Sequence, residues 1–295
     1  MPERTIGVVG LGAMGLPIAS ALHRAQSSVV GFDVVESARD RATGQSVPVT
    51  DDLGALARDC DVLVLSLPTP AVVRDVVERI AVAARPGTVV LDTSTIDPGT
   101  SQDAARRLEE VGSSYADCPV LGRPSAVGRW TMPLGGSDEV VALAREVLAP
   151  VAARIVHVGA VGMGVTLKIL NNMMLATINA ATAEALVLAE AAGLDPGTFV
   201  DTLVDSGAAS ISGLFREVAP RAVDGDFTPT FSLRLMHKDN DLALRMADRH
   251  GVPLPVATAT QTLTTMGVAA GHGDEDSVAV IKVLETITRH AARRH

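Results

Sequence analysis

Three features of this sequence predict a doubly wound α/β domain followed by an all-helical domain. In the first half, short apolar runs alternate with segments of helical periodicity, a pattern typical of a parallel sheet with helices on both faces. A glycine-rich turn follows the first apolar run. After about residue 160 the strand signals stop and only helical patterns continue. We therefore expect two domains, residues 1–160 and 161–295, joined by a long helix.

A glycine-rich turn lies between a predicted strand over residues 5–9 and a predicted helix over residues 13–25. In a turn of this spacing the first glycine allows a tight bend, the second lets a pyrophosphate approach the backbone, and the third lets the helix pack on the strand. The positive end of the helix dipole then faces the phosphates. The turn therefore predicts a Rossmann-type dinucleotide site. Its cofactor-binding residues are expected to be Gly10, Gly12, Ala13, Met14 and Gly15.

The second apolar run, residues 28–32, ends at Asp33. A carboxylate at this place can accept hydrogen bonds from both adenosine-ribose hydroxyls and would repel a 2′-phosphate. No Arg or Lys follows directly. We therefore expect that the cofactor is NAD rather than NADP. The alternative interpretation is that Asp33 is a cap or turn residue.

The rest of the first half supplies the other strands and the loops beyond them. Strands are expected over residues 47–49, 62–66, 89–92 and 114–117, and helices over residues 70–84 and 98–111. In such sheets ligands bind beyond the carboxyl ends of the strands. This places Leu67 and Pro68, Thr95, and the stretch after Asp117 at the predicted site.

In the second half the pattern is helical throughout. Helices are expected over residues 163–193, 196–205, 233–250, 255–270 and 276–293. Gly193, Gly251 and Gly271 fit positions at helix C-termini.

Composition excludes several classes of protein. The chain is 47% hydrophobic and 20% charged, as in soluble globular proteins, and its net charge of −9 argues against a nucleic-acid partner. Polar residues within residues 165–192 would make a bilayer costly for this apolar stretch. Cys60 and Cys118 do not make a disulfide framework, and no signal peptide or metal-binding spacing is apparent. We expect a cytoplasmic protein without a membrane partner or a catalytic metal.

Lys168 is the best candidate for a proton-transferring group, because none of the seven histidines stands out. It lies in the long apolar helix, where lost hydration would lower its pKa and let it exchange protons near neutrality. Asn172 is four residues further and shares its helix face. The two could hold one substrate oxygen together. The alternative is a lysine that extends from a partly exposed helix into solvent.

Four motifs in order make the chain resemble the β-hydroxyacid dehydrogenase family, which includes 3-hydroxyisobutyrate dehydrogenase. The resemblance covers essentially the whole length. The motifs are the glycine turn with Pro17, the run Asp92-Thr93-Ser94-Thr95-Ile96-Asp97-Pro98, the run Gly162-Met163-Gly164 with Lys168-Ile169-Leu170-Asn171-Asn172, and the run Phe231-Ser232-Leu233-Arg234-Leu235-Met236-His237-Lys238-Asp239.

The resemblance implies an NAD(P)-dependent oxidoreductase that interconverts a short β-hydroxy acid and its semialdehyde. It implies that Lys168 is the general acid/base and that Asn172 holds the substrate. It also implies that Thr95 and Lys238 line the cofactor–substrate cleft, with Phe231 and Asp239 close by. Because the family uses its helical domain for subunit contacts, a homodimer or homotetramer is implied.

The chain departs from the family in the loop after Asp117. The family has Asp-x-Pro-Val-Ser-Gly-Gly there, and its Ser-Gly-Gly segment holds the substrate carboxylate. This chain has Leu121 in place of the serine and Arg123 in place of the second glycine. Arg123 could pair with a carboxylate, sulfonate or phosphate, or could point to solvent, and the N–H of Gly122 could still hold an anion. We therefore expect a substrate preference that differs from that of the Ser-Gly-Gly members.

Two other functions stay open at this point. Imine reductases share the architecture and also depart at the Ser-Gly-Gly loop, but they commonly lack the lysine that this chain has at position 168. A non-catalytic NAD(H)-binding protein on the same fold is the other alternative. Leu121 favours it, whereas the presence of Lys168 and Asn172 argues against it.

Overall fold

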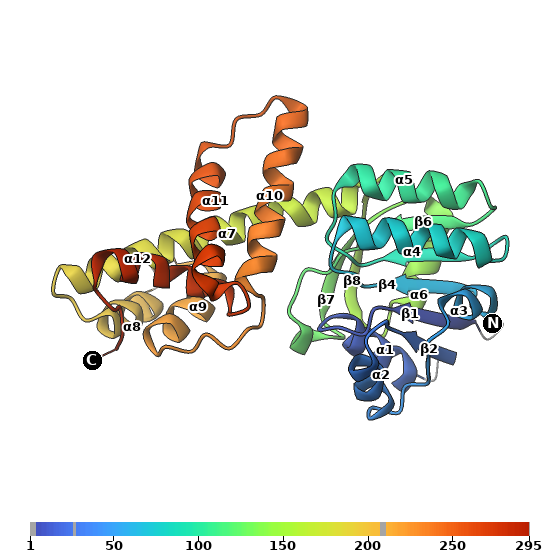
Figure 1. Ribbon diagram of the computed structural model, residues 1–295, viewed down its shortest axis with the longest axis horizontal. Coiled ribbons are helices and arrows are strands. Elements are labelled where there is room, and N and C mark those ends of the chain that lie inside the picture. The colour runs from blue at the N-terminus through green and yellow to red at the C-terminus, as the bar shows by residue number, and fades with distance from the viewer. Residues whose placement is uncertain (1–3, 26–27, 207–210, 295) are drawn as a thin grey trace. The chain divides into compact units, whose positions relative to one another are not determined.

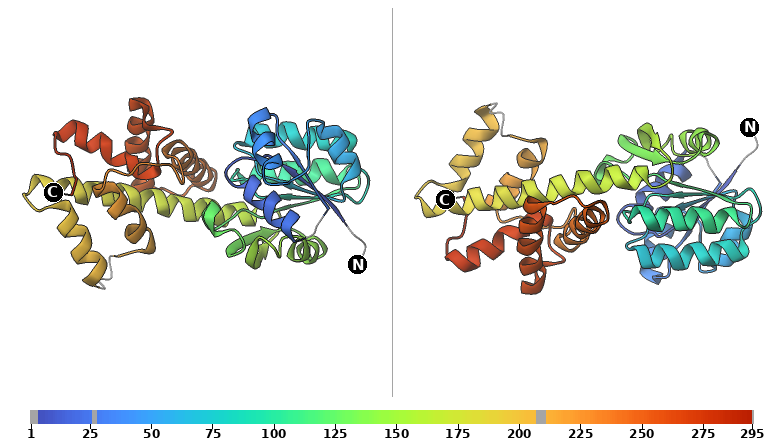
Figure 2. Two further views of the ribbon diagram at one scale, coloured as in Figure 1. Left: turned by 90° about the horizontal axis from the view of Figure 1, so that it is seen from below. Right: turned by 90° about the horizontal axis from the view of Figure 1, so that it is seen from above.

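The computed structural model describes residues 4–25, 28–206 and 211–294. The chain divides into two compact units, Met1–Lys168 and Ile169–His295, which Figures 1 and 2 show from three directions. The boundary falls inside a long helix, α7 (Met163–Ala191), which begins in the first unit and ends in the second. The first unit is α/β and the second is helical.

The described part of the first unit contains one eight-stranded sheet, in the order β3-β2-β1-β4-β5-β6-β7-β8. The strands wind outward in both directions from β1 and β4, so the predicted doubly wound sheet is confirmed. Neighbouring strands are parallel except β6 and β7, which are antiparallel. The strands are β1 (Thr5–Val9), β2 (Ser28–Phe32), β3 (Val49–Thr50), β4 (Val62–Leu65), β5 (Val89–Asp92), β6 (Ser114–Asp117), β7 (Trp130–Gly135) and β8 (Ala152–Gly159).

Helices cover both faces of this sheet, and each face has its own apolar core. Helices α1 (Gly15–Arg24), α2 (Glu36–Thr43) and α6 (Asp138–Val147) contribute to one core. Helices α3 (Leu53–Asp59), α4 (Pro70–Ala83) and α5 (Pro98–Glu109) contribute to the other. Because both faces are covered, consecutive residues such as Val8 and Val9 are both buried. This explains why the strands read as continuous apolar runs.

Helices α3, α4 and α5 each begin at a side-chain cap. Asp52, Thr69 and Asp97 each accept a hydrogen bond from the backbone N–H three residues further on, at the starts of α3, α4 and α5. Proline follows the cap in α4 and α5, where its fixed φ suits the first helical position. The polar residue before each helix therefore fixes where the chain leaves the sheet edge.

The second unit is built around the later part of α7. Its core includes the fully buried side chains of Leu186, Val218, Met236 and Ile281. The left-handed conformations of Gly193, Gly251 and Gly271 confirm that these glycines end helical segments. The other helices of this unit are α8 (Pro196–Ser206), α9 (Gly213–Val223), α10 (Leu233–His250), α11 (Pro255–Gly267) and α12 (Ile281–Thr288), with a π-helical turn at Val268–His272 and a 3₁₀ turn at Ser277–Val280. In the first unit a 3₁₀ turn lies at Pro124–Ala126.

Several elements differ from the sequence-based expectation. The strand expected over residues 47–49 forms at Val49–Thr50, and the helix expected over residues 276–293 ends at Thr288 because Arg289 is left-handed. Helices α2, α3, α6 and α9 and strands β7 and β8 were not expected. Short helices such as α2 bury only two alanines, Ala38 and Ala42, so their periodic signal is weak.

Helix α7 is long and apolar enough, by length and composition alone, to cross a membrane. Half of its most apolar 18-residue stretch is buried in the structure. Asn172 and Asn179 are also buried on it and donate hydrogen bonds within the second unit. Buried, hydrogen-bonded amides of this kind are typical of a helix in a protein core.

Candidate functional site

The glycine-rich turn has the geometry that its three glycines predicted. Gly10 has φ +93°, and a Cβ there would lie 2.3 Å from the carbonyl oxygen of Ser66. A Cβ at Gly15 would lie 1.8 Å from the carbonyl oxygen of Gly10. A Cβ at Gly12 would meet nothing within 4 Å. The outer glycines are thus required by packing inside the protein, whereas Gly12 leaves open space in front of the turn. These features fit a bound pyrophosphate.

Asp33 is held beside this turn by two backbone groups. Its carboxylate accepts hydrogen bonds from the N–H of Leu11 at 2.8 Å and of Val35 at 2.9 Å. A carboxylate has about four acceptor positions, so two are left for ribose hydroxyls. The two interpretations of Asp33, turn residue and ribose ligand, are therefore compatible.

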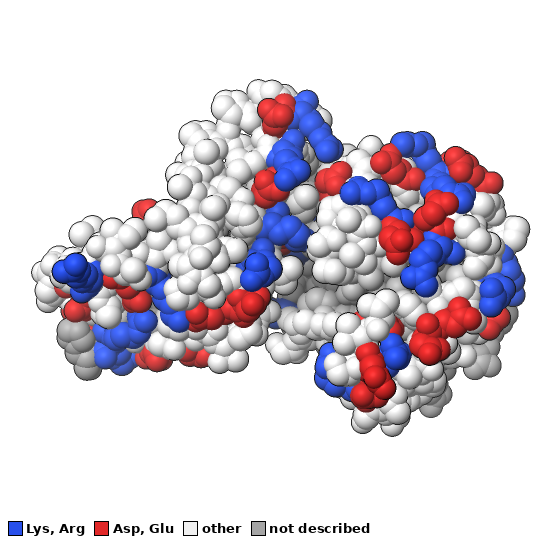
Figure 3. Space-filling view, in the orientation of Figure 1, with Lys and Arg blue, Asp and Glu red and all other residues white. Residues whose placement is uncertain are grey.

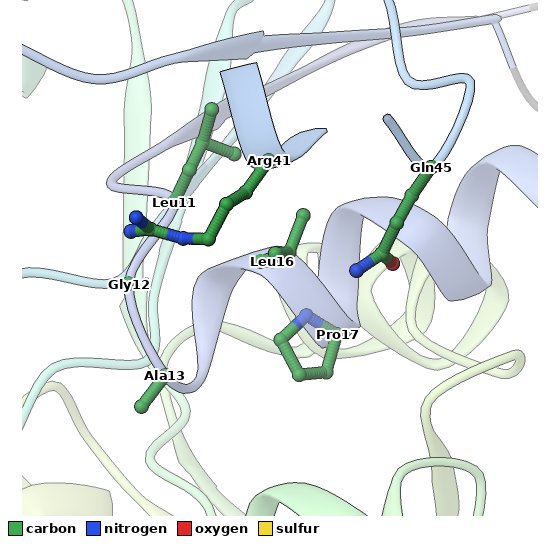
Figure 4. A pocket seen from close by; sticks show the side chains of 7 residues that line it. All are labelled: Leu11, Gly12, Ala13, Leu16, Pro17, Arg41 and Gln45. Atoms are coloured by element: carbon green, nitrogen blue, oxygen red, sulfur yellow. The ribbon is translucent and has the colours of Figure 1, made fainter. Parts of the chain in front are cut away.

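A cavity of about 380 Å³ opens at the turn (Figure 4). Helix α2 contributes Arg41, whose guanidinium is drawn close to the turn, and Gln45 follows this helix. Neither residue is among the predicted site residues, because the sequence does not predict α2. The other residues that line the cavity are Leu11, Gly12, Ala13, Leu16 and Pro17.

The loops beyond β4 and β5 are tied to each other. The N–H of Leu67 donates to the Ser94 hydroxyl at 2.9 Å, and the Thr93 hydroxyl donates to the carbonyl of Leu65 at 2.7 Å. Pro68 is exposed and Thr95 is half-buried on these loops. The structure therefore brings the predicted Leu67, Pro68 and Thr95 to the carboxyl edge of the sheet.

Two buried carboxyl groups lie side by side at the ends of β5 and β6. Asp92 accepts hydrogen bonds from the N–H of Ser94 and the hydroxyl of Tyr115, each at 2.8 Å. Asp117, its neighbour in the sheet register, accepts from the N–H groups of Gly162 at 2.6 Å and Val165 at 2.7 Å. Burial raises the pKa of Asp92, and it raises the pKa of Asp117 from 3.8 to about 6.

The loop that departs from the family pattern is fixed on β7. Gly122 has φ +151°, and a Cβ there would lie 2.5 Å from Cδ1 of Trp130. The indole N–H of Trp130, which is fully buried, donates to the carbonyl of Arg123 at 2.8 Å. Leu121 pairs with Thr131 as an antiparallel bridge. The backbone at Gly122 and Arg123 is thus held in place, and the Arg123 residue is half-buried.

Lys168 and Asn172 lie one turn apart on α7, as predicted. Lys168 is half-buried and Asn172 is 2% exposed. In the second unit, the amide nitrogen of Asn172 donates to Asp239 at 2.6 Å, and Nζ of Lys238 lies 2.9 Å from the other oxygen of Asp239. The structure therefore joins Asn172, Lys238 and Asp239 in one polar cluster, held by a hydrogen bond and an ion pair, with Asp239 at its centre.

Two residues beside this cluster, Asn171 and Phe231, make contacts that the sequence does not predict. Asn171, which was not singled out, donates to the amide oxygen of Asn172 at 2.9 Å. Phe231 packs against the core of the second unit, and its carbonyl accepts from the N–H of Ser277 at 2.8 Å. The first contact orients the amide of Asn172, and the second joins the segment before α10 to Ser277. The doublet Asn171-Asn172 was visible in the sequence, but no periodic signal marked the first asparagine.

The described residues hold no group of three or more His, Cys, Asp and Glu side chains placed to bind a metal ion. Cys60 and Cys118 are buried thiols, and burial raises the pKa of Cys60 to about 12. On the face shown in Figure 3, Lys and Arg side chains alternate with Asp and Glu. That face therefore does not present the continuous positive surface that binds a phosphate backbone.

Two family models match the chain. The model of the NAD binding domain of 6-phosphogluconate dehydrogenase matches residues 5–159, and the NAD-binding model of NADP-dependent 3-hydroxyisobutyrate dehydrogenase matches residues 162–284. The chain belongs to the β-hydroxyacid dehydrogenase family. These matches confirm the family that the four sequence motifs predicted.

The relatives match this chain over nearly its whole length. L-threonate dehydrogenase of Cupriavidus necator is 36% identical over 97% of each chain. 2-(Hydroxymethyl)glutarate dehydrogenase of Eubacterium barkeri is 34% identical over 96% of this chain and 95% of its own length. The structure of Mycobacterium tuberculosis 3-hydroxyisobutyrate dehydrogenase with L-serine has a TM-score of 0.86 and 34% identity, and covers 96% of this chain and 99% of its own.

Proposed function

We propose that this chain, an NAD(P)-dependent oxidoreductase of the β-hydroxyacid dehydrogenase family acting on CH–OH groups, interconverts a short β-hydroxy acid and its semialdehyde. The observation that carries the proposal is the pairing of Lys168 and Asn172 one turn apart on α7, in a chain whose glycine turn is open at Gly12. Hydride transfer to a carbonyl needs a cofactor site and a proton donor, and these residues would supply both.

The residues of the first unit would hold and orient the cofactor. The N–H groups after Gly12 and the start of α1 would bind the pyrophosphate, and Asp33 would bind the adenosine ribose. When bound, the nicotinamide supplies or accepts the hydride. Because Asp33 would repel a 2′-phosphate, we propose NAD rather than NADP as the preferred cofactor. Leu67, Pro68 and Thr95 would line the same edge.

Lys168 would act as the general acid/base. In the reduction its ammonium gives a proton to the carbonyl oxygen of the substrate, and in the oxidation its amine takes the proton of the hydroxyl. The amide nitrogen of Asn172 has two hydrogens, of which one is donated to Asp239. The other would be donated to the same substrate oxygen. Lys238, held by Asp239, would add positive charge at the cofactor–substrate site.

The proposed substrate class is supported by the relatives and by the loop at Arg123. L-threonate and 2-(hydroxymethyl)glutarate, named for two relatives, are hydroxy acids, and L-serine in the third relative's structure is a β-hydroxy acid. The carbonyl of Arg123 is anchored by Trp130, so the origin of its side chain is fixed. We propose that Arg123 and the N–H of Gly122 bind the acid group of the substrate, with Phe231 and Asp239 near it.

Subunit association is the last part of the proposal. Apolar side chains are exposed on the helical unit: Met174 is 61% exposed, Leu188 70% and Val256 61%. Such side chains suit a subunit contact, and we propose a cytoplasmic homodimer or homotetramer. Light scattering after size exclusion measures this state, and a monomer at micromolar concentration would rule it out.

The function is tested by following NADH and NADPH consumption with a panel of carbonyl compounds. The panel contains glyoxylate, tartronate semialdehyde, methylmalonate semialdehyde, succinic semialdehyde and a cyclic imine. We expect turnover of at least one acid aldehyde, with a higher kcat/KM for NADH than for NADPH. Turnover of the imine alone would place the protein with the imine reductases, and NADH binding without turnover would favour a non-catalytic role.

A further inference from the structure

The start of α7 is capped by a side chain from another element. Gly162 directly precedes the helix and Val165 lies in its first turn, and neither has a side chain that could cap it. Asp117, at the end of β6, accepts hydrogen bonds from both N–H groups, at 2.6 Å and 2.7 Å. In a capping box two local side chains satisfy these two donors. Here one carboxylate from the sheet does so.

The surroundings of Asp117 leave almost no freedom to this contact. A Cβ at Gly164 would lie 2.8 Å from one carboxylate oxygen of Asp117, and a Cβ at Gly135 would lie 2.6 Å from the other. Gly162 has φ +97°, a conformation that favours glycine. The carboxylate thus lies between glycines of β7 and of the start of α7. The contact fixes both the height and the rotation of the helix against the sheet.

We propose that Asp117 is a positioning residue for the reaction, because it fixes the first turn of α7 against the sheet and thereby places Lys168, one turn further along. This inference rests on the proposed role of Lys168. It adds a residue that does not touch the substrate. Asp117, the first turn of α7 and Lys168 all belong to the first unit.

The arrangement also predicts how the contact between Asp117 and the start of α7 depends on pH. Asp92, on the neighbouring strand, is the charged group that faces Asp117. The hydroxyl of Tyr115 donates to Asp92, and the thiol of Cys118 is next to Asp117 in the chain. The pKa of Asp117 is about 6, raised mainly by burial. Below this pH the carboxyl gains a proton, so one of the two N–H groups loses its acceptor. Because these N–H groups lower the pKa of Asp117, protonation should weaken its contact with the start of α7 in acid, whereas the loss of a buried charge does not destabilise the folded unit as a whole.

The kinetic test compares wild type with Asp117→Asn, which has the shape of the protonated carboxyl. We expect kcat to fall about tenfold to hundredfold at neutral pH, with the dissociation constant for NADH nearly unchanged, because small displacements of a reacting group are costly. The ratio of the two kcat values should approach 1 as the pH falls below about 6. A purely structural role would not give this pH dependence.

Asp52→Asn is the matched control, because Asp52 caps α3 in the same unit by the same type of hydrogen bond. Helix α3 carries none of the proposed site residues. We expect this variant to have the wild-type kcat at every pH. A loss of kcat in both variants would mean that any weakened cap in the unit lowers activity, and it would overturn the proposal.

A second readout does not depend on turnover. The lysines of the chain are Lys168, Lys238 and Lys282, so reductive methylation with ¹³C-formaldehyde followed by NMR resolves each of them, with Lys168→Arg to identify the signal. We expect Asp117→Asn to change the chemical shift and titration of the Lys168 signal, but not those of Lys282, which pairs with Glu275. In wild type the Lys168 signal should show a second inflection at about pH 6.

The outcomes separate this inference from the proposed function. If wild type reduces no carbonyl of the panel, the proposed function fails, and the NMR comparison still tests the positioning of Lys168. If Asp117→Asn does not fold, the inflection in wild type carries the test. An unchanged Lys168 signal, or a kcat ratio that stays near 1 at neutral pH, would overturn the proposal and leave Asp117 a residue for folding alone.

Discussion

Replacing Asp239 by alanine removes the centre of the polar cluster of Asn172, Lys238 and Asp239 in the second unit. Asp239 has a side chain only 3% exposed, and it accepts from Asn172 at 2.6 Å and pairs with Lys238 at 2.9 Å. In the variant the buried amide of Asn172 loses its acceptor and the ammonium of Lys238 loses its counterion. The amide of Asn172 would remain where water has little access.

The magnitude follows from the burial of the two partners. Removing one partner of a buried ion pair costs about 3–5 kcal/mol, and a lost hydrogen bond to a charged group about 1.5–3 kcal/mol. The Lys238 side chain is 23% exposed, so water can partly replace its partner. We therefore expect the free energy of unfolding to fall by about 3 kcal/mol, the lower end of the first range.

The assay is urea unfolding at neutral pH followed by circular dichroism and by the fluorescence of Trp130, the single tryptophan. Trp130 lies in the first unit, so the two signals show whether the second unit is destabilised by itself. The matched control is Asp241→Ala on the same helix, whose exposed pair with Arg245 contributes about 0.5 kcal/mol. A loss below about 1 kcal/mol for Asp239→Ala would refute the reasoning, because it would mean that the cluster is accessible to water.

Three further predictions concern the first unit. Gly15→Ala should prevent normal folding of the turn, because its Cβ would lie 1.8 Å from a carbonyl oxygen. Gly12→Ala should have the melting temperature of wild type but lose NADH binding, because a Cβ there meets nothing in the protein. Equal melting temperatures of the two variants would contradict this prediction. Asp33→Ser should raise kcat/KM for NADPH relative to NADH at least about tenfold by removing the charge that repels a 2′-phosphate, and an unchanged ratio would show that Asp33 does not select the cofactor. Arg123→Ala should raise KM for acid substrates strongly without changing NADH affinity, and an unchanged KM would exclude Arg123 as the acid-binding group.

The sequence predicted the parts of the fold whose signals are local. The strands over residues 28–32, 89–92 and 114–117 and the helix over residues 233–250 have the predicted bounds. The strands are short runs set between helical segments, and the helix is a periodic run between the cap residue Ser232 and Gly251. Strands β7 and β8 were missed. The sequence of β7 contains Pro133 and Gly135, which read as turn residues, and its partner β8 is half exposed.

The candidate site was predictable only as a set of residue types. The spacing of Lys168 and Asn172 indicates a shared helix face, and the glycine turn indicates a phosphate site. Sequence spacing does not show that Asp239 holds Asn172, or that Asp117 caps α7, because these contacts join residues far apart in the chain. Such pairings depend on tertiary packing, which no local pattern encodes.

The central claim is that Lys168 transfers the proton in a hydride-transfer reaction on a β-hydroxy acid. The most direct measurement is the kcat of Lys168→Ala with the best substrate of the panel, beside wild type and the control Lys282→Ala. General acid/base catalysis contributes about 10²- to 10⁴-fold, so we expect kcat to fall at least about hundredfold in Lys168→Ala, with NADH affinity unchanged and Lys282→Ala like wild type. A kcat within about tenfold of wild type would contradict the account, because another group would then transfer the proton.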